Sequence, residues 1–300
     1  MFYIKKLYVT SQYLIVILLL FFSSQSYAQI PNHQQMPKLS SKQMAEMYHR
    51  RGEYDQAIKI YRSLLESGER DSTLFRGLIR TWRASGKSLL AKEFIKEFIG
   101  KNPDCSGCWY GSGYLNYLEK EDVEAEKNFL KAIELNPENA MAWNNLGAVR
   151  TRTKSYTMAV KNIKEAIWLD QGNSMFYNNL WIVYEDMGEN GLFFAEFEKY
   201  VLKGPRKMAV GYGKAIARKL RQKGFAVYSK GNLDEALKQF QEMVEIYRKI
   251  DYKPGLVPGL FSLGLLLEEK GEPSLALEKY KQLLKINPNH IQAREKIKEE

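Results

Sequence analysis

The chain of 300 residues carries 45 Lys and Arg against 35 Asp and Glu, which gives a formal net charge of +10. Hydrophobic residues make up 45% of it, so the chain can bury a continuous core. Its three histidines, His33, His49 and His290, do not stand in the spacing of a metal-ligand set or a catalytic triad, and no glycine-rich phosphate loop follows a strand. These features argue against metal-dependent and hydrolytic enzymes, and they indicate no cofactor.

The first 28 residues have the pattern of an export signal. Lys5 and Lys6 precede an apolar stretch from Tyr13 to Phe22, and Ser26 and Ala28 are small residues at the positions that a signal peptidase inspects. Ten apolar residues are too few to cross a hydrocarbon layer of about 30 Å as a helix. We therefore expect a signal peptide that is cleaved near Ala28, with an uncleaved anchor as the alternative. The mature chain then has 43 basic and 35 acidic residues, a formal charge of +8, and is periplasmic or secreted.

A period of 34 residues runs through most of the remaining chain. Four alanines follow it, at Ala57, Ala91, Ala125 and Ala159, and a fifth step arrives at Phe193. Other residue types recur at the same interval: Trp109, Trp143 and Tyr177; Tyr61, Ile95, Phe129, Ile163 and Phe197; Leu146 and Leu180; Pro103, Pro137 and Pro205. The period and the residue types resemble the tetratricopeptide repeat family, whose unit is a helix-turn-helix of 34 residues.

The resemblance implies an all-α chain, a right-handed α-solenoid of about seven helix-turn-helix repeats. In such a unit the alanine allows the two helices to cross closely. The first five units are contiguous: 38–71, 72–105, 106–139, 140–173 and 174–207. The period is then lost, and two further units fit at 217–250 and 257–290.

The expected organisation follows from these units. A flexible, proline-broken lead-in covers residues 29–40, and repeats one to five lie within 41–207. Residues 208–300 hold a joint of extended helix at 208–216, repeats six and seven, and a polar, helix-prone C-terminal cap.

Five residues depart from the family's pattern: Phe193, Trp181, Gln171, Arg150 and Asn116. Phe193 and Trp181 replace small residues of the fifth repeat, so we expect that helix pair to open or shift. Arg150 occupies a position that usually holds a buried aromatic ring. Because a buried charge without a partner is costly, we expect Arg150 to reach an acid or solvent.

Cys105-Ser106-Gly107-Cys108 is the one motif with intrinsic reactivity, and it stands where a helix should begin. A local disulfide between Cys105 and Cys108 would stiffen the turn between two repeats in an oxidising compartment. The alternative is a thiol-disulfide oxidoreductase, since a thiol at a helix N-terminus gains thiolate character. Redox motifs of this spacing normally follow a strand, which favours the structural disulfide. Trp109 in place of histidine argues against covalent haem.

In the family, the concave face is lined by the first helix of each repeat, at its second, fifth, ninth and twelfth positions. The resemblance thus implies a partner groove at Arg76, Arg80, Arg83, Tyr110, Tyr114, Tyr117, Asn144 and Asn178. Arginine binds carboxylates bidentately and tyrosine offers a rigid amphipathic surface, which suits an extended peptide or a helix. The alternative is that the tyrosines pack between repeats and that the asparagines are family consensus.

A second candidate surface is the segment from Lys199 to Gly231, which has ten basic residues and no acid. The ten are Lys199, Lys203, Arg206, Lys207, Lys214, Arg218, Lys219, Arg221, Lys223 and Lys230. Such a field attracts an anionic lipid, polysaccharide or protein surface, and nucleic acid is a poor candidate for an exported protein. The alternative is a solvated helix face.

The resemblance implies a non-catalytic scaffold or adaptor that binds protein partners. Lys42 matches the first residue of the family's carboxylate-binding set, but Glu46, Gly77 and Gly107 stand at later positions, which disfavours a cytosolic chaperone adaptor. With an export signal, we expect a role in the bacterial cell envelope, in the assembly of a pilus, secretion or polysaccharide-export machine. The sequence leaves open whether the array is a monomer or a homodimer that forms through its last repeats.

Overall fold

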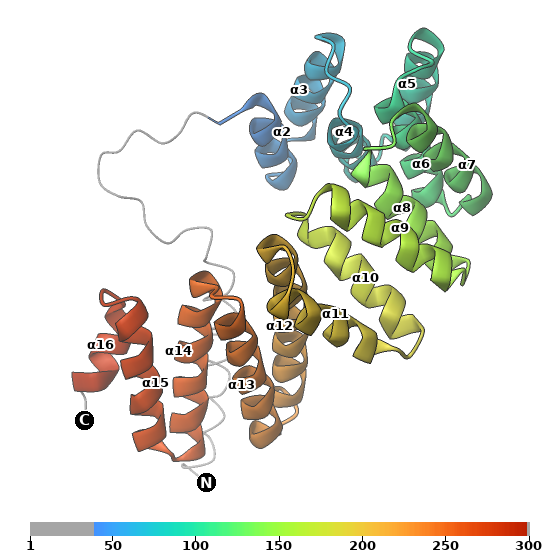
Figure 1. Ribbon diagram of the computed structural model, residues 1–300. Coiled ribbons are helices and arrows are strands. Elements are labelled where there is room, and N and C mark those ends of the chain that lie inside the picture. Colours follow the sequence, from blue (N-terminus) through green and yellow to red (C-terminus); the bar gives the residue numbers. More distant parts are fainter. Residues whose placement is uncertain (1–38, 299–300) are drawn as a thin grey trace. The chain divides into compact units, whose positions relative to one another are not determined.

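The computed structural model describes residues 39–298, which hold fifteen helices and no strand. By their internal packing they fall into two compact units that meet between Lys199 and Tyr200 in the sequence. We call residues 39–199 the N-terminal unit and residues 200–298 the C-terminal unit, and Figure 1 shows both. The expected signal peptide at 1–28, most of the lead-in at 29–40 and His33 lie outside the described residues.

Helix pairs follow one another through the N-terminal unit, and each predicted 34-residue repeat contains one pair. The pairs are α2 (Ser41–Arg50) with α3 (Tyr54–Glu66), α4 (Ser72–Ala84) with α5 (Ser88–Lys101), α6 (Ser106–Glu119) with α7 (Asp122–Leu135), α8 (Ala140–Arg152) with α9 (Tyr156–Leu169), and α10 (Ser174–Asp186) with α11 (Asn190–Leu202). The all-α solenoid that the period predicts is therefore confirmed.

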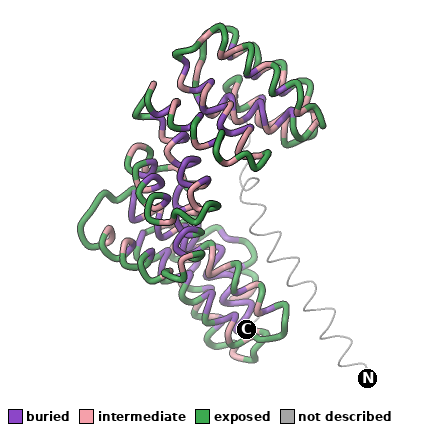
Figure 2. The backbone as a smooth tube through the Cα atoms, turned by 90° about the vertical axis from the view of Figure 1, so that its right-hand side faces the viewer, coloured by how far each residue is buried: buried purple, intermediate pink, exposed green. Residues whose placement is uncertain are grey.

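The core of the unit lies between the helices, along their facing sides (Figure 2). All four ladder alanines have no exposed surface. Helices α8 and α9 cross closely, because a Cβ added to Gly147 would lie 2.4 Å from Cγ1 of Ile163 and 3.1 Å from the carbonyl oxygen of Ala159. Small residues on both helices let the backbones approach and the ridges interdigitate, as the period implies.

The turn between the two helices of a repeat also has a fixed geometry. Gly52 and Gly86 take a left-handed conformation, with φ of 79° and 74°. The next two repeats have no glycine there, yet Lys120 and Lys154 adopt the same conformation, with φ of 66° and 62°. A side chain makes this conformation unfavourable by roughly 1–2 kcal/mol. The packed helix pairs therefore impose the turn even where the sequence does not favour it.

The departures from the family's pattern in the fourth and fifth repeats have structural solutions. Arg150 lies 2.7 Å from the Glu126 carboxylate through its Nη2 atom, so the expectation that it reaches an acid is confirmed. In the fifth repeat Trp181 and Phe193 are buried, with ring centroids 5.1 Å apart in an edge-to-face arrangement. These two rings fill the crossing that holds a small residue in the other repeats.

The C-terminal unit is a second series of antiparallel helices: α12 (Arg206–Tyr228), α13 (Leu233–Lys249), α14 (Lys253–Lys270), α15 (Pro273–Ile286) and α16 (Ile291–Lys298). Residues 208–216, the predicted joint, lie inside the 23-residue helix α12. Helix α14 packs closely on α15, since a Cβ on Gly264 would lie 2.2 Å from the Tyr280 ring. None of the helices described in the chain combines the length and apolar character that crossing a membrane requires.

Candidate functional site

The candidate groove of the N-terminal unit begins at α4, which carries three arginines at a spacing of four and three residues. Arg76 and Arg80 are half-buried and Arg83 is exposed. The guanidinium carbon of Arg76 lies 5.6 Å from the Tyr114 ring centroid, close enough for a cation–π contact. Arg80 lies near His49, whose pKa is lowered first by burial and then by the Arg80 charge. Within residues 39–298, none of these three arginines has an ion-pair partner.

The tyrosines of α6 are divided between packing and surface. Tyr110 has no exposed area and Tyr114 keeps 7%, and their rings stack with centroids 6.1 Å apart. Burial raises the pKa of Tyr110, and its hydroxyl accepts a hydrogen bond from Asn145 Nδ2 at 3.0 Å. Tyr110 and Tyr114 therefore do not line an open groove, because the neighbouring repeats cover them. Tyr117 is the exception.

Tyr117 is half-buried, and the guanidinium carbon of Arg152 lies 4.3 Å from its ring centroid. Arg152 is itself paired with the Asp122 carboxylate. One face of the Tyr117 ring is thus held by a paired arginine. The ring is fixed in place and keeps part of its surface for a partner.

The asparagines form a hydrogen-bond chain through three repeats. Asn179 Nδ2 donates to Asn144 Oδ1 at 2.9 Å, Asn144 Nδ2 donates to Asn145 Oδ1 at 2.9 Å, and Asn145 donates to Tyr110. Asn144 has no exposed area, so it is a structural residue and not a partner contact. Asn178 is half-buried, and its amide makes no hydrogen bond within the described part of the chain.

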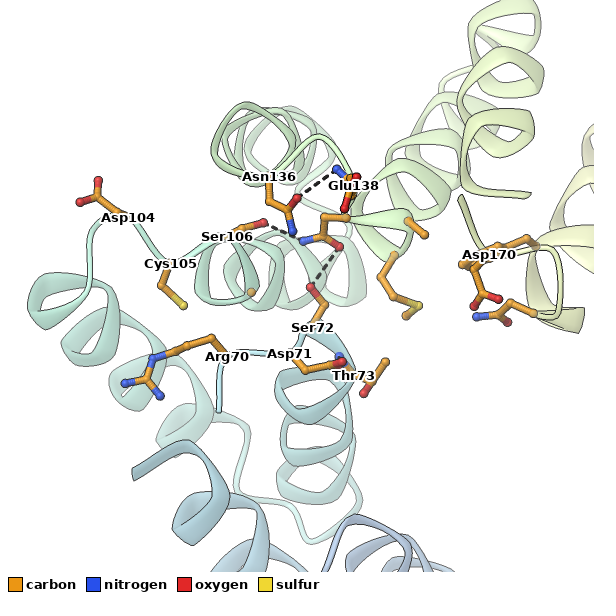
Figure 3. A pocket seen from close by; sticks show the side chains of 16 residues that line it. Arg70, Asp71, Ser72, Thr73, Asp104, Cys105, Ser106, Asn136, Glu138 and Asp170 are labelled. Atoms are coloured by element: carbon orange, nitrogen blue, oxygen red, sulfur yellow. Dashed lines mark hydrogen bonds between the residues drawn. The ribbon is translucent and has the colours of Figure 1, made fainter. Parts of the chain in front are cut away.

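A cavity of about 460 Å³ lies at another edge of the same unit, where the N-terminal turns of α4, α6, α8 and α10 meet (Figure 3). Asn139 is one of the residues that line it. Its Oδ1 atom accepts from Ser72 Oγ at 3.1 Å and its Nδ2 atom donates to Ser106 Oγ at 2.8 Å, so one amide links the N-terminal ends of α4 and α6. The same Oδ1 atom caps α8 through the amide of Ala142. The periodic pattern did not reveal this junction, although Asn139 stands one period before Asn173.

The residues that cap α4, α6, α8 and α10 stand 34 residues apart, and Cys105 is one of them. Asp71, Asn139 and Asn173 accept backbone amides through side-chain oxygens, whereas the Cys105 sulfur accepts the amide of Cys108 at 3.1 Å. The two cysteines are joined in a disulfide. Cys105 is 8% exposed and Cys108 has no exposed area. Because thiol exchange needs an accessible sulfur, this burial favours a structural disulfide.

The basic segment is spread over both units. Lys199, in the N-terminal unit, is exposed, as are Lys203, Arg206, Lys207, Arg218, Lys223 and Lys230; Lys214, Lys219 and Arg221 are half-buried. Two of these side chains serve the fold: Arg206 donates to the Ile250 carbonyl and Lys223 lies 3.8 Å from Glu235. The Lys214 ammonium lies 5.0 Å from the Tyr252 ring centroid.

His49 and His290 lie in different units, and residues 39–298 contain no group of three His, Cys, Asp or Glu side chains that could hold a metal ion. His49 instead shares a hydrogen bond with Thr81 through Nδ1 at 2.9 Å. His290 packs on Phe261, with ring centroids 5.1 Å apart. Both imidazoles therefore serve packing in the described structure.

Family models of the tetratricopeptide repeat match residues 40–74, 128–161 and 215–289. The chain is similar to the C-terminal part of a TPR repeat-containing protein from Cytophaga hutchinsonii, with 14% identity and a TM-score of 0.40, covering 85% of this chain and 98% of that one. It is also similar to YrrB, a TPR protein with an unusual peptide-binding site, with 21% identity and a TM-score of 0.35, covering 67% of this chain and 96% of that one. A third similar structure is the human IFIT1 dimer with PPP-AAAA, with 14% identity and a TM-score of 0.47, covering 82% of this chain and 63% of that one. No curated protein sequence matches the chain.

Proposed function

Because the chain is a tetratricopeptide-repeat protein, and such arrays are scaffolds for protein interactions, we propose that it holds a segment of a partner protein in the groove of its N-terminal unit. The observation that carries this proposal is the division of side chains along the first helices. Tyr110, Tyr114 and Asn144 are buried and support the surface. Arg80, one period before Tyr114, and Asn178, one period after Asn144, keep polar groups without partners in the described residues.

The proposed scaffold is not an enzyme. Its groove offers guanidinium, phenol and amide groups that bind and orient a peptide, and these groups form no nucleophile and base pair. Asn178 can bind a peptide unit through both its amide oxygen and its amide nitrogen. Tyr117 supplies a ring surface whose position is already fixed, so binding costs little side-chain entropy.

Photo-crosslinking in the cells that produce the protein tests the proposal. A photoreactive phenylalanine analogue replaces Tyr117 in the groove, and in a matched control it replaces Trp168, an aromatic residue of the second helix α9 that is 62% exposed. We expect a discrete partner from the Tyr117 position and none from the Trp168 position. Equal or absent crosslinking at the two positions contradicts a partner groove.

We further propose that the scaffold works outside the cytoplasm, in a bacterial cell envelope, where it organises a pilus, secretion or polysaccharide-export assembly. The support is the pattern of residues 1–28 in the sequence. N-terminal sequencing of the protein from its native cells tests the export step. A chain that begins at Gln29 is expected, and a chain in the cytosolic fraction that still carries residues 1–28 contradicts it.

A second candidate function rests on α12. Lys207, Lys214 and Arg218 are spaced by seven and four residues, which places them on one face of this helix, and none has an ion-pair partner in the described residues. This face would bind an anionic membrane or polymer.

Replacement of Lys207, Lys214 and Arg218 by glutamate should abolish flotation with phosphatidylglycerol vesicles. The charge-matched control replaces Lys238, Lys281 and Lys285, which are exposed on α13 and α15. Equal flotation of both variants rules out this function.

A further inference from the structure

The arginines of α4 differ from those cationic side chains of the N-terminal unit that are paired with an acid. Arg150 pairs with Glu126, and Lys164 lies 2.7 Å from Glu196. Arg76, Arg80 and Arg83 have no such partner among the described residues. Three guanidinium groups are thus kept together on one helix without a counter-ion.

Two of the three are partly enclosed by the structure. Arg76 and Arg80 are half-buried. Arg76 lies over the Tyr114 ring, and that ring stacks on the buried Tyr110, so the guanidinium rests on a rigid aromatic pair. Arg80 lies close enough to His49 to lower its pKa. The three side chains stand four and three residues apart on one helix, so their like charges repel each other, and an anionic ligand would relieve that repulsion.

We propose that the partner segment held in this groove is an acidic, extended peptide, an inference that rests on the proposed scaffold function. With a rise of 1.5 Å per residue, Arg76 and Arg83 are about 10 Å apart along the helix axis. Alternate side chains of an extended peptide are about 6.6 Å apart, so three acids at alternate positions span about 13 Å. Flexible arginine side chains cover this small difference, and each guanidinium can take a carboxylate bidentately.

A peptide fits this surface better than a lipid headgroup or another polyanion. Arg76 and Arg80 are half-buried residues, which a flat membrane surface reaches less well than a narrow peptide does. The first helices of the following repeats present Tyr117 and Asn178, groups that bind peptide side chains and peptide units. An extended segment that enters on α4 with its acids continues onto these groups.

The test measures the fluorescence anisotropy of labelled ten-residue peptides with the full-length protein. One peptide has glutamate at alternate positions with serine between, and the second has glutamine in place of glutamate. We expect the glutamate peptide to bind at least tenfold more tightly, with an affinity that falls as salt rises. Equal affinity for the two peptides overturns the proposal.

Two double variants localise the binding. Arg80→Glu with Arg83→Glu should lower the affinity for the glutamate peptide at least tenfold. The charge-matched control, Lys96→Glu with Lys161→Glu, changes two exposed lysines of the second helices α5 and α9 and should lower it less than threefold. If the control weakens binding as much, net charge and not α4 attracts the peptide. Unchanged helical circular dichroism shows that the variants are folded.

The crosslinking at Tyr117 separates this inference from the proposed function. A partner recovered there through a segment without acids overturns the acidic peptide and leaves the scaffold intact. Tight binding of the glutamate peptide with no partner crosslinked in cells supports the chemistry of α4 and contradicts the scaffold role.

Discussion

Gly147 allows a direct test of the close crossing that the repeat period implies. Replacing it by alanine adds a methyl group 2.4 Å from Cγ1 of Ile163 and 3.1 Å from the carbonyl oxygen of Ala159. Ile163 and Ala159 have no exposed surface, so neither has free space to move into. The helix pair must therefore separate or shift to admit the methyl group.

The expected magnitude is the difference of two effects. Overpacking a tight core costs about 1–3 kcal/mol. Alanine is a better helix former than glycine by about 0.5–1 kcal/mol. The crossing dominates, and we expect Gly147→Ala to lower the free energy of unfolding by about 1–2 kcal/mol. Gly100→Ala is the matched control, because Gly100 is helical and exposed and its added Cβ meets nothing within 4 Å. The control should be neutral or stabilising by up to about 1 kcal/mol.

Urea unfolding followed by far-UV circular dichroism measures both variants. A Gly147→Ala protein that is as stable as Gly100→Ala would refute the close crossing. The double variant with Ile163→Ala provides a second measurement. Ile163→Ala alone leaves a cavity and costs about 2–5 kcal/mol. Since the methyl group at position 147 then occupies part of that cavity, the double variant should lose less than the sum of the single losses.

Three further predictions concern other parts of the N-terminal unit. Asn139→Ala should lower the free energy of unfolding by about 2–3 kcal/mol, because it removes the cap of α8 and the side-chain hydrogen bonds to Ser72 and Ser106. Asn173→Ala removes only a cap and should lower it by about 1 kcal/mol. Equal losses in urea unfolding would contradict the junction. Lys154→Gly should raise the free energy of unfolding by about 0.5–1 kcal/mol, because φ at this position is 62°, a left-handed conformation that glycine adopts more readily than lysine. A less stable variant would contradict the conclusion that the helix pair imposes this turn. Reduction of the Cys105–Cys108 disulfide should lower the free energy of unfolding by about 2 kcal/mol, because this is the loop-closure entropy of so short a loop. An unchanged urea midpoint after reduction would show that the bond does not stabilise the fold.

For the tyrosines of α6, the sequence predicts their common helix but not their exposure. The spacing of Tyr110, Tyr114 and Tyr117 correctly puts them on one helix, α6. Their exposure differs because α4 and α8 cover two of them, and the covering residues come from other repeats. Helical periodicity describes a single helix, so it cannot distinguish a ring that faces a partner from a ring that faces the next repeat.

The sequence by itself determined the helix pairs and their crossings, because a 34-residue period with small residues at Ala57, Ala91, Ala125 and Ala159 leaves each pair one close way to pack. Tertiary structure alone decided the left-handed turns at Lys120 and Lys154 and the junction at Asn139. It also decided which groove residues keep free polar groups. The physical reason is that burial and hydrogen bonding depend on side chains from two neighbouring repeats. The sequence pattern of one repeat does not specify which residues of the next repeat contact it.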